Sequence, residues 1–239
     1  MSAEERTPKG YHSPFAAHFA RLQEQSTRLI LVRHGEATMP AEYVRGPLNT
    51  PLSTRGIEQA KRVAERLRDF DCSAVYTSPL KRASETAEII SQTLQLPVAK
   101  TEALREIDLT LHAPAEMPLA EVYSQIEDLW NANPSSGYWL KWADLPFAET
   151  GEELRQRVTS AIDEILPQNI GETVCIVCHG GVINGYLGSL LSLSHDFWFH
   201  PHNTSLNIVS VYQGSFLLHT LNDVGHLQFN ETSKEGLLT

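Results

Sequence analysis

Short, uninterrupted apolar runs alternate along this chain with longer segments of mixed polarity. The clearest runs cover residues 29–32 and 173–178, and such runs are typical of strands buried on both faces of a sheet. A similar short run at 74–76 and the start of another at Leu96 predict two further strands. The pattern therefore predicts a central sheet with both faces covered.

Between these runs, apolar or small residues recur at steps of three and four, which predicts amphipathic helices. The segments with this spacing are 54–69, 80–94 and 152–166, and a further helix is expected from 180 through 191. Ser53 precedes the first segment and is a favourable N-cap. Because strands and helices alternate, we predict an α/β fold: a three-layer α/β/α sandwich with a mostly parallel sheet.

The ends and the middle of the chain depart from this alternation. Residues 206–212 and 215–221 flank Gln213-Gly214 and predict a closing hairpin, which gives the sheet an antiparallel edge strand. The stretch from 104 to 146 shows no clean period, and we interpret about 107–149 as an insertion. Residues 1–27 read as an N-terminal extension, followed by one domain over 28–239.

Composition narrows the possible partners and the cellular compartment. The 239 residues hold 19 Lys and Arg against 29 Asp and Glu, a formal charge of −10, which disfavours nucleic acid and anionic membranes as partners. No apolar run reaches the length of a spanning helix. Three cysteines, Cys72, Cys175 and Cys178, are too few for a disulfide framework. We expect a cytoplasmic protein.

Two of the predicted strands end in a His-Gly step, at His34 and at His179. Ligands of open α/β sheets bind at the carboxyl ends of the strands, so both histidines are expected to face one point. Arg33 lies beside the first histidine, and Arg82 lies at the start of the helix after the next strand. Two guanidinium groups and two imidazoles suit a phosphoryl group, whose oxygens match the arginine fork.

Five ordered segments resemble the signature of the histidine phosphatase superfamily, also called phosphoglycerate-mutase-like. They are 31–38 (LVRHGEAT), 51–60 with its Pro-Leu-Ser, Gly and Gln-Ala, 78–87 (SPLKRASETA), 104–106 (LRE) and 177–181 (VCHGG). The resemblance spans about 28–212, and five motifs in the correct order make a chance match improbable. It implies the phosphoglycerate-mutase-like fold.

The resemblance implies a transfer in two steps. His34 would attack phosphorus to give a phosphohistidine, and water or another acceptor would then take the phosphoryl group. Glu106 would protonate the leaving oxygen and later deprotonate water. Asp108 lies close enough in sequence to compete with Glu106 for this role.

The resemblance also implies which groups bind the substrate. The phosphoryl oxygens would be held by Arg33, Arg82, His179 and the Gly180 N–H. Arg45 falls where the family places a substrate-facing side chain, and Thr38 could supply a hydroxyl at the rim of the site. Pro40 stands where many members carry an asparagine that contacts the phosphoryl group, and proline cannot donate that hydrogen bond.

The resulting hypothesis is a phosphatase that needs no metal or cofactor, hydrolyses a small phosphomonoester and releases inorganic phosphate. A phosphomutase of the same superfamily is the first alternative, although the next cationic residue after Arg105 is Lys141, which leaves few partners for a second anionic group. A non-catalytic phosphate-binding protein is the second. Neither the identity of the substrate nor the oligomeric state can be predicted from the sequence.

Overall fold

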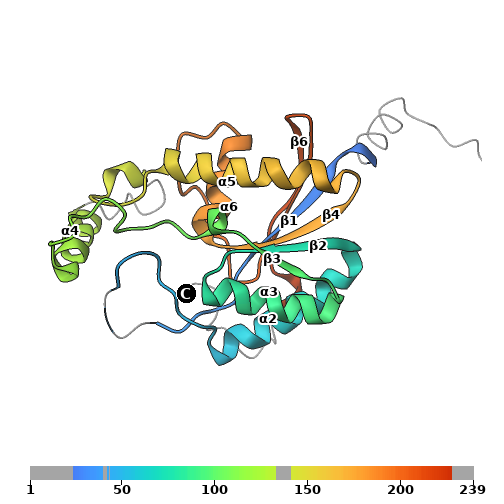
Figure 1. Cartoon of the computed structure of the whole chain (residues 1–239), viewed down its shortest axis with the longest axis horizontal. Coiled ribbons are helices and arrows are strands. Elements are labelled where there is room, and N and C mark those ends of the chain that lie inside the picture. Colours follow the sequence, from blue (N-terminus) through green and yellow to red (C-terminus); the bar gives the residue numbers. More distant parts are fainter. Residues whose placement is uncertain (1–23, 40–41, 43, 133–140, 228–239) are drawn as a thin grey trace, which may run out of the picture.

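The protein is organised around a six-stranded sheet with the order β3-β2-β4-β1-β5-β6 (Figure 1). The computed structural model describes residues 24–39, 42, 44–132 and 141–227. The strands are β1 (Thr27–Arg33), β2 (Cys72–Thr77), β3 (Val98–Lys100), β4 (Thr173–Cys178), β5 (Leu206–Tyr212) and β6 (Ser215–Asp223). β1 to β4 are mutually parallel, and β5 pairs antiparallel with both β1 and β6. The predicted mostly parallel sheet with an antiparallel edge is confirmed.

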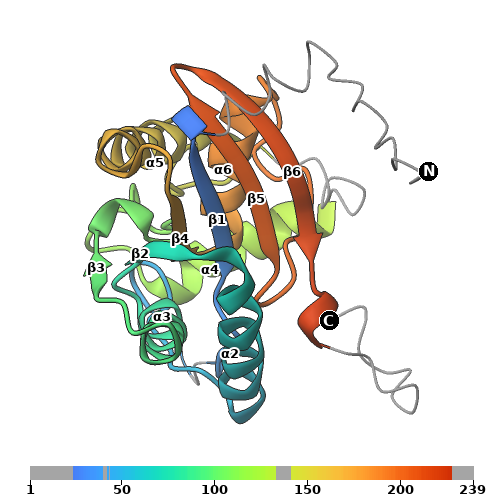
Figure 2. The same cartoon turned by 90° about the vertical axis from the view of Figure 1, so that its right-hand side faces the viewer.

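Helices cover both faces of the sheet and complete the three layers (Figures 1 and 2). They are α2 (Thr54–Leu67), α3 (Lys81–Leu94), α4 (Leu119–Ala132), α5 (Gly151–Ile165) and α6 (Gly180–Leu190). Short 3-10 turns include η2 (Glu102–Leu104), η4 (Trp142–Asp144), η5 (Leu166–Asn169) and η6 (Gly225–Leu227). Among the described residues, no helix combines the length and apolar character needed to cross a membrane.

The alternation of side chains along β1 explains the layers. Ile30 and Val32 pack with α2 and α3, whereas Leu29 and Leu31 pack with α5 and α6. All four side chains are at most 1% exposed, as expected of a strand covered on both sides. The uninterrupted apolar run thus follows from burial on both faces.

The same alternation separates the two cysteines of the C-x-x-C spacing in β4. Cys175 belongs to the cluster beneath α2 and α3, and Cys178 belongs to the cluster beneath α5 and α6. Both are fully buried free thiols, and burial raises the pKa of each. They therefore serve as core residues.

The closing hairpin has the predicted two-residue turn. Tyr212 pairs with Ser215, and Gln213 and Gly214 between them have φ angles of 46° and 78°. Two successive positive φ values match the right-handed twist of the flanking strands. Glycine adopts this backbone conformation without the steric cost of a Cβ atom.

The insertion contains a helix that the sequence pattern did not predict. Helix α4 occupies 14 residues of the stretch interpreted as irregular. Among the side chains of α4 that the structure describes, Val122 and Ile126 are the buried ones, and they pack in a small cluster with Leu145 and Ala148. Two buried side chains one turn apart give only a weak helical period, which explains why the helix was not predicted.

The C-terminal turn η6 contributes a titratable group to the domain. The Nε2 atom of His226 lies 3.1 Å from Thr204 Oγ1, and Thr204 binds the Arg33 carbonyl through its N–H at 2.9 Å. Burial, followed by the Arg66 and Arg62 charges, lowers the pKa of His226 from 6.5 to about 4 against an opposing effect of Asp223. The folded protein therefore keeps this histidine neutral.

We expect this histidine to make the fold sensitive to acid. Between pH 6.5 and about 4 the unfolded chain binds a proton here that the folded chain does not, so the free energy of unfolding falls as pH drops. His226→Gln does not titrate, so the Tm advantage of the wild type at pH 8 should shrink at pH 5. Thermal denaturation of both proteins at the two pH values measures this difference. A constant difference would contradict the assignment.

Candidate active site

Adjacent parallel strands bring the two predicted histidines together. β1 and β4 pair in register, with Arg33 opposite Cys178, so the residues that follow them, His34 and His179, leave the sheet side by side. Their ring centroids lie 5.1 Å apart, and the His34 N–H donates to the Cys178 carbonyl at 3.0 Å. The prediction that both imidazoles face one point at the carboxyl edge agrees with this geometry.

Hydrogen bonding defines the tautomer of His34. Its Nδ1 lies 2.7 Å from the Gly35 carbonyl oxygen, which can only accept, so Nδ1 carries the proton. Nε2 then holds the lone pair and accepts a hydrogen bond from Arg82 Nε at 3.0 Å. An imidazole in this state has its nucleophilic nitrogen turned toward a guanidinium group.

Arg82 reaches His34 from the first turn of α3. Its Nη1 donates to the Leu48 carbonyl, which fixes the side chain from the opposite side. The helix start is itself anchored, because the Lys81 N–H donates to Asn49 Oδ1 at 2.8 Å. The loop before α2 therefore supports both the helix end and the arginine.

Arg33 and His179 each present a buried nitrogen that has no hydrogen-bond partner among the described residues. Arg33 Nη1 donates to the Pro201 carbonyl at 2.6 Å, and His179 Nε2 lies 2.8 Å from Ser78 Oγ. In the described part of the chain, three buried side-chain nitrogen or oxygen atoms lack a hydrogen-bond partner, and Arg33 Nε and His179 Nδ1 are two of them. Buried polar atoms normally have partners, so an oxyanion is a suitable ligand here.

The electrostatic setting keeps both imidazoles neutral. Burial holds the pKa of His34 well below 6.5, and the charges of Arg82 and Arg33 lower it further. Burial likewise lowers the pKa of His179, with Arg82 next in effect. A neutral His34 retains its nucleophilic lone pair at pH values where a free histidine is already protonated.

Glu106 joins the site through the N-terminus of α6. The Gly181 N–H points at its carboxylate, 3.1 Å from Oε1 and 3.3 Å from Oε2. A helix N-terminus favours a negative charge. A Cβ atom on Gly181 would lie 2.4 Å from Glu106 Oε1 and 2.3 Å from Trp142 Cη2, so only glycine allows this approach.

Asp108, the competing candidate for the acid, is engaged elsewhere. Its Oδ1 accepts hydrogen bonds from the N–H and the hydroxyl of Thr110, at 2.8 Å and 2.9 Å. Glu106, in contrast, is close enough to raise the pKa of both Arg33 and Arg82 against the lowering effect of burial. The geometry favours Glu106 as the carboxylate of the cluster.

The remaining predicted substrate contacts have other surroundings in this structure. The Arg45 guanidinium donates to backbone carbonyls of the insertion, with the shortest contact, 2.8 Å, to Met117 O. The Thr38 hydroxyl is exposed and donates to the Pro51 carbonyl at 3.3 Å. Gly180 begins α6 and lies close to Arg33: a Cβ atom added to this glycine would be 3.9 Å from Arg33 Nε. The expectation for Pro40 lies outside the described residues.

Sequence reasoning did not identify the contacts that hold the two histidines in place. Ser78 Oγ fixes His179, as described above, and Thr86 Oγ1 accepts from the Gly35 N–H at 3.0 Å. Asn203 Nδ2 donates to the His34 carbonyl at 2.9 Å. Ser78 and Thr86 lie in the second arginine motif, which offered a signal, whereas Asn203 is 169 positions from His34.

The loop after α6 contains three histidines, His195, His200 and His202, beside Asp196. Its Asp196 is 5% exposed, pairs with Arg155 and accepts the Trp142 N–H at 2.8 Å. Within the described ranges, no group of three or more His, Cys, Asp or Glu side chains is arranged to hold a metal ion.

Comparisons with known proteins indicate the family of this chain. The model of the histidine phosphatase superfamily (branch 1) matches residues 29–224. The uncharacterized phosphatase PhoE of Bacillus subtilis (strain 168) is 34% identical over 163 residues, which cover 67% of this chain and 76% of PhoE. The metal-independent phosphoserine phosphatase of Arabidopsis thaliana is 30% identical over 213 residues, which cover 87% of this chain and 86% of that protein.

A solved structure, YhfR of Bacillus stearothermophilus, superimposes with a TM-score of 0.68 and 28% sequence identity, covering 84% of this chain and 100% of YhfR. Proteins named as phosphoglycerate mutases or mutase-like proteins are also among the relatives. The fold is therefore the predicted phosphoglycerate-mutase-like fold. Since the family model matches most of the chain, the chain belongs to the histidine phosphatase superfamily.

Proposed function

We propose that this protein hydrolyses a small phosphomonoester through a phosphohistidine at His34 and releases inorganic phosphate. The observation that carries the proposal is the unprotonated Nε2 of His34, which accepts a hydrogen bond from Arg82, together with two buried nitrogens that lack partners among the described residues, Arg33 Nε and His179 Nδ1. Those nitrogens are available for phosphoryl oxygens. Arginine forks at such a site offset the charge repulsion between nucleophile and phosphate.

In the first step, His34 Nε2 donates its electron pair to phosphorus as the bond from phosphorus to the leaving oxygen breaks. Arg82 Nε turns from the imidazole to a phosphoryl oxygen, and Arg33, His179 and the Gly180 N–H take the others. Glu106, in its protonated form, gives its proton to the leaving alcohol. Catalysis here rests on position and on charge stabilisation.

In the second step, water attacks the phosphohistidine and the bond from phosphorus to Nε2 breaks. Glu106, now ionised, accepts the proton of the attacking water, which restores its acidic form. His34 returns to its neutral state with Nδ1 still hydrogen-bonded to the Gly35 carbonyl. The Gly35 contact therefore holds one tautomer through both steps.

Several observations favour hydrolysis over transfer to a second substrate position. Residues 106–140 contain no lysine or arginine, and the Arg45 guanidinium is used by the carbonyls of the insertion. A mutase needs cationic partners for a second anionic group of its substrate. The relative named as a metal-independent phosphoserine phosphatase supports the same choice.

The free thiols fit the predicted cytoplasmic location.

We expect Glu106→Gln to change the leaving-group dependence of hydrolysis. Without the acid, alkyl phosphates should slow by roughly 10²-fold to 10⁴-fold, because an alkoxide leaves poorly without a proton. p-Nitrophenyl phosphate should slow much less, since nitrophenolate needs little protonation. Values of kcat/KM with EDTA present measure both effects, because they report the first step and not the later attack of water, in which Glu106 also acts. Silence of the wild type across a panel of phosphomonoesters would overturn the proposed function, and equal slowing would overturn the role of Glu106.

A further inference from the structure

The segment that carries Glu106 is held by one arginine of α5. Arg157 Nη1 donates to the carbonyls of Ala103 and Arg105, at 2.7 Å and 2.8 Å, and Nη2 lies 3.4 Å from the Glu106 carbonyl. These three acceptors belong to four consecutive residues that end at Glu106. A single side chain therefore fixes the backbone from which the proposed acid projects.

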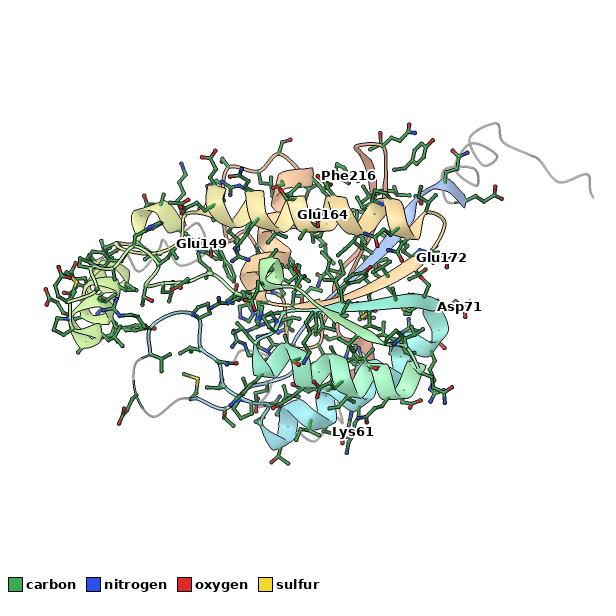
Figure 3. The ribbon with its side chains drawn as sticks, in the orientation of Figure 1. Lys61, Asp71, Glu149, Glu164, Glu172 and Phe216 are labelled. Atoms are coloured by element: carbon green, nitrogen blue, oxygen red, sulfur yellow. The ribbon has the colours of Figure 1, made fainter. Side chains whose placement is uncertain are left out.

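The other donors of Arg157 go to a buried carboxylate. Arg157 Nε and Nη2 bind the two oxygens of Glu149, at 2.5 Å and 2.8 Å. With the carbonyl contacts, all five N–H donors of the guanidinium have acceptors. The Glu149 side chain is 6% exposed and that of Arg157 is 25% exposed, so this is a pair largely removed from water. Figure 3 labels Glu149 near the start of α5, on the side of the insertion.

Glu149 also ties down the residues after Glu106. Its Oε2 accepts the Asp108 N–H at 3.3 Å, and its own N–H donates to the Asp108 carbonyl at 2.7 Å. The backbone is thus held on both sides of Glu106, by Arg157 before it and by Glu149 after it. The Glu106 carboxylate, in turn, accepts a hydrogen bond from the Gly181 N–H. Few degrees of freedom remain for this side chain.

Resting on the proposed function, we infer that Glu149 and Arg157 are positioning residues for proton transfer by Glu106. The phosphoryl-binding groups are held in place by other residues, since Arg33, Arg82 and His179 are fixed by Pro201, Leu48 and Ser78 respectively. Loosening the pair therefore affects the protonation of the leaving group and spares the binding of phosphate. A small displacement of a catalytic group from its reactive geometry is enough to slow the reaction.

The test is Arg157→Lys, which keeps the charge and loses the planar five-donor fork. Relative to wild type, we expect phosphoserine hydrolysis to fall by roughly tenfold or more and p-nitrophenyl phosphate hydrolysis by a much smaller factor. The inhibition constant of inorganic phosphate should be the same as for the wild type. Arg62→Lys is the matched control. Arg62, on α2, also binds a carboxylate, that of Glu58, and a backbone carbonyl, that of Leu227 in η6. This variant should leave both rates unchanged.

A second arm separates positioning from general destabilisation. In the Glu106→Gln background, Arg157→Lys should slow phosphoserine hydrolysis no further, because the group that it positions is already gone. If Arg157→Lys fails to fold, Glu149→Gln is tested in its place. The amide has one oxygen, so it cannot accept both hydrogen bonds from Arg157, and the same selective slowing is expected.

The possible results are distinguishable. Equal slowing of the two substrates by Arg157→Lys, or an additive loss in the double variant, would overturn the positioning role. Glu106→Gln that shows its leaving-group signature while Arg157→Lys has no effect would overturn this inference alone. If the wild type hydrolyses none of the esters, the proposed function fails first.

Discussion

Replacing His34 with alanine is expected to abolish phosphate release, with a loss of roughly 10⁴-fold or more. The variant removes the nitrogen that attacks phosphorus, and the neighbouring Arg33, Arg82 and His179 do not supply another nucleophile in its position. The side chain is 6% exposed, but its loss leaves the sheet intact, because β1 is held by its two neighbouring strands. The measurement is the initial rate on a panel of phosphomonoesters with EDTA present.

A covalent adduct provides the direct readout for this prediction. Wild-type protein mixed with substrate and quenched without acid should gain the mass of one phosphoryl group, and His34→Ala should not. His219→Ala is the control, since His219 lies on the edge strand β6 and contacts Ser210 of the neighbouring strand β5. A His34→Ala variant that still releases phosphate at the wild-type rate would refute the role of His34 as nucleophile.

Gly181→Ala is expected to slow the hydrolysis of alkyl phosphates by roughly 10²-fold. The new Cβ atom would lie 2.4 Å from Glu106 Oε1 and 2.3 Å from Trp142 Cη2. Both distances are too short for non-bonded atoms, so the carboxylate and the indole ring must both shift. The shift of the carboxylate displaces Glu106 from the leaving oxygen.

The matched control for this prediction is Gly185→Ala, one turn further along α6. Its Cβ would lie 3.2 Å from Leu154 Cδ2, the end of a flexible side chain that can adjust. Rates on phosphoserine and p-nitrophenyl phosphate, with a thermal melt for each variant, complete the comparison. If Gly181→Ala slows alkyl phosphates no more than Gly185→Ala does, then the close approach of Glu106 to α6 is not required for catalysis.

Much of the catalytic cluster can be predicted from local sequence because the signals are local. An uninterrupted apolar run predicts a strand covered on both faces, and a His-Gly step at its end predicts a polar side chain at the carboxyl edge. His34 and His179 satisfy both conditions. Their separation of 5.1 Å depends further on β4 lying next to β1, and the order of strands in a sheet leaves no mark on either strand alone.

The features that the sequence did not reveal depend on contacts between distant segments. Arg157 looks like any polar residue on an amphipathic helix, because its carbonyl acceptors lie about fifty positions earlier in the chain. Helix α4 escaped prediction because Val122 and Ile126 cover only a small cluster of the insertion. That Arg45 faces the substrate stays a prediction.

The attachment of the insertion has a consequence for how this scaffold can be altered. Its two ends lie side by side, joined by backbone hydrogen bonds between Asp108 and Glu149 and between His112 and Phe147, at 2.7 Å and 2.8 Å. When the ends of a loop are already joined, its length adds only slowly to the entropy of closure, by about 0.6 kcal/mol per doubling. Apart from Trp142, which packs in the core beside Gly181, the segment between residues 112 and 147 is therefore a place where the sequence can be exchanged while the sheet and its histidines stay fixed.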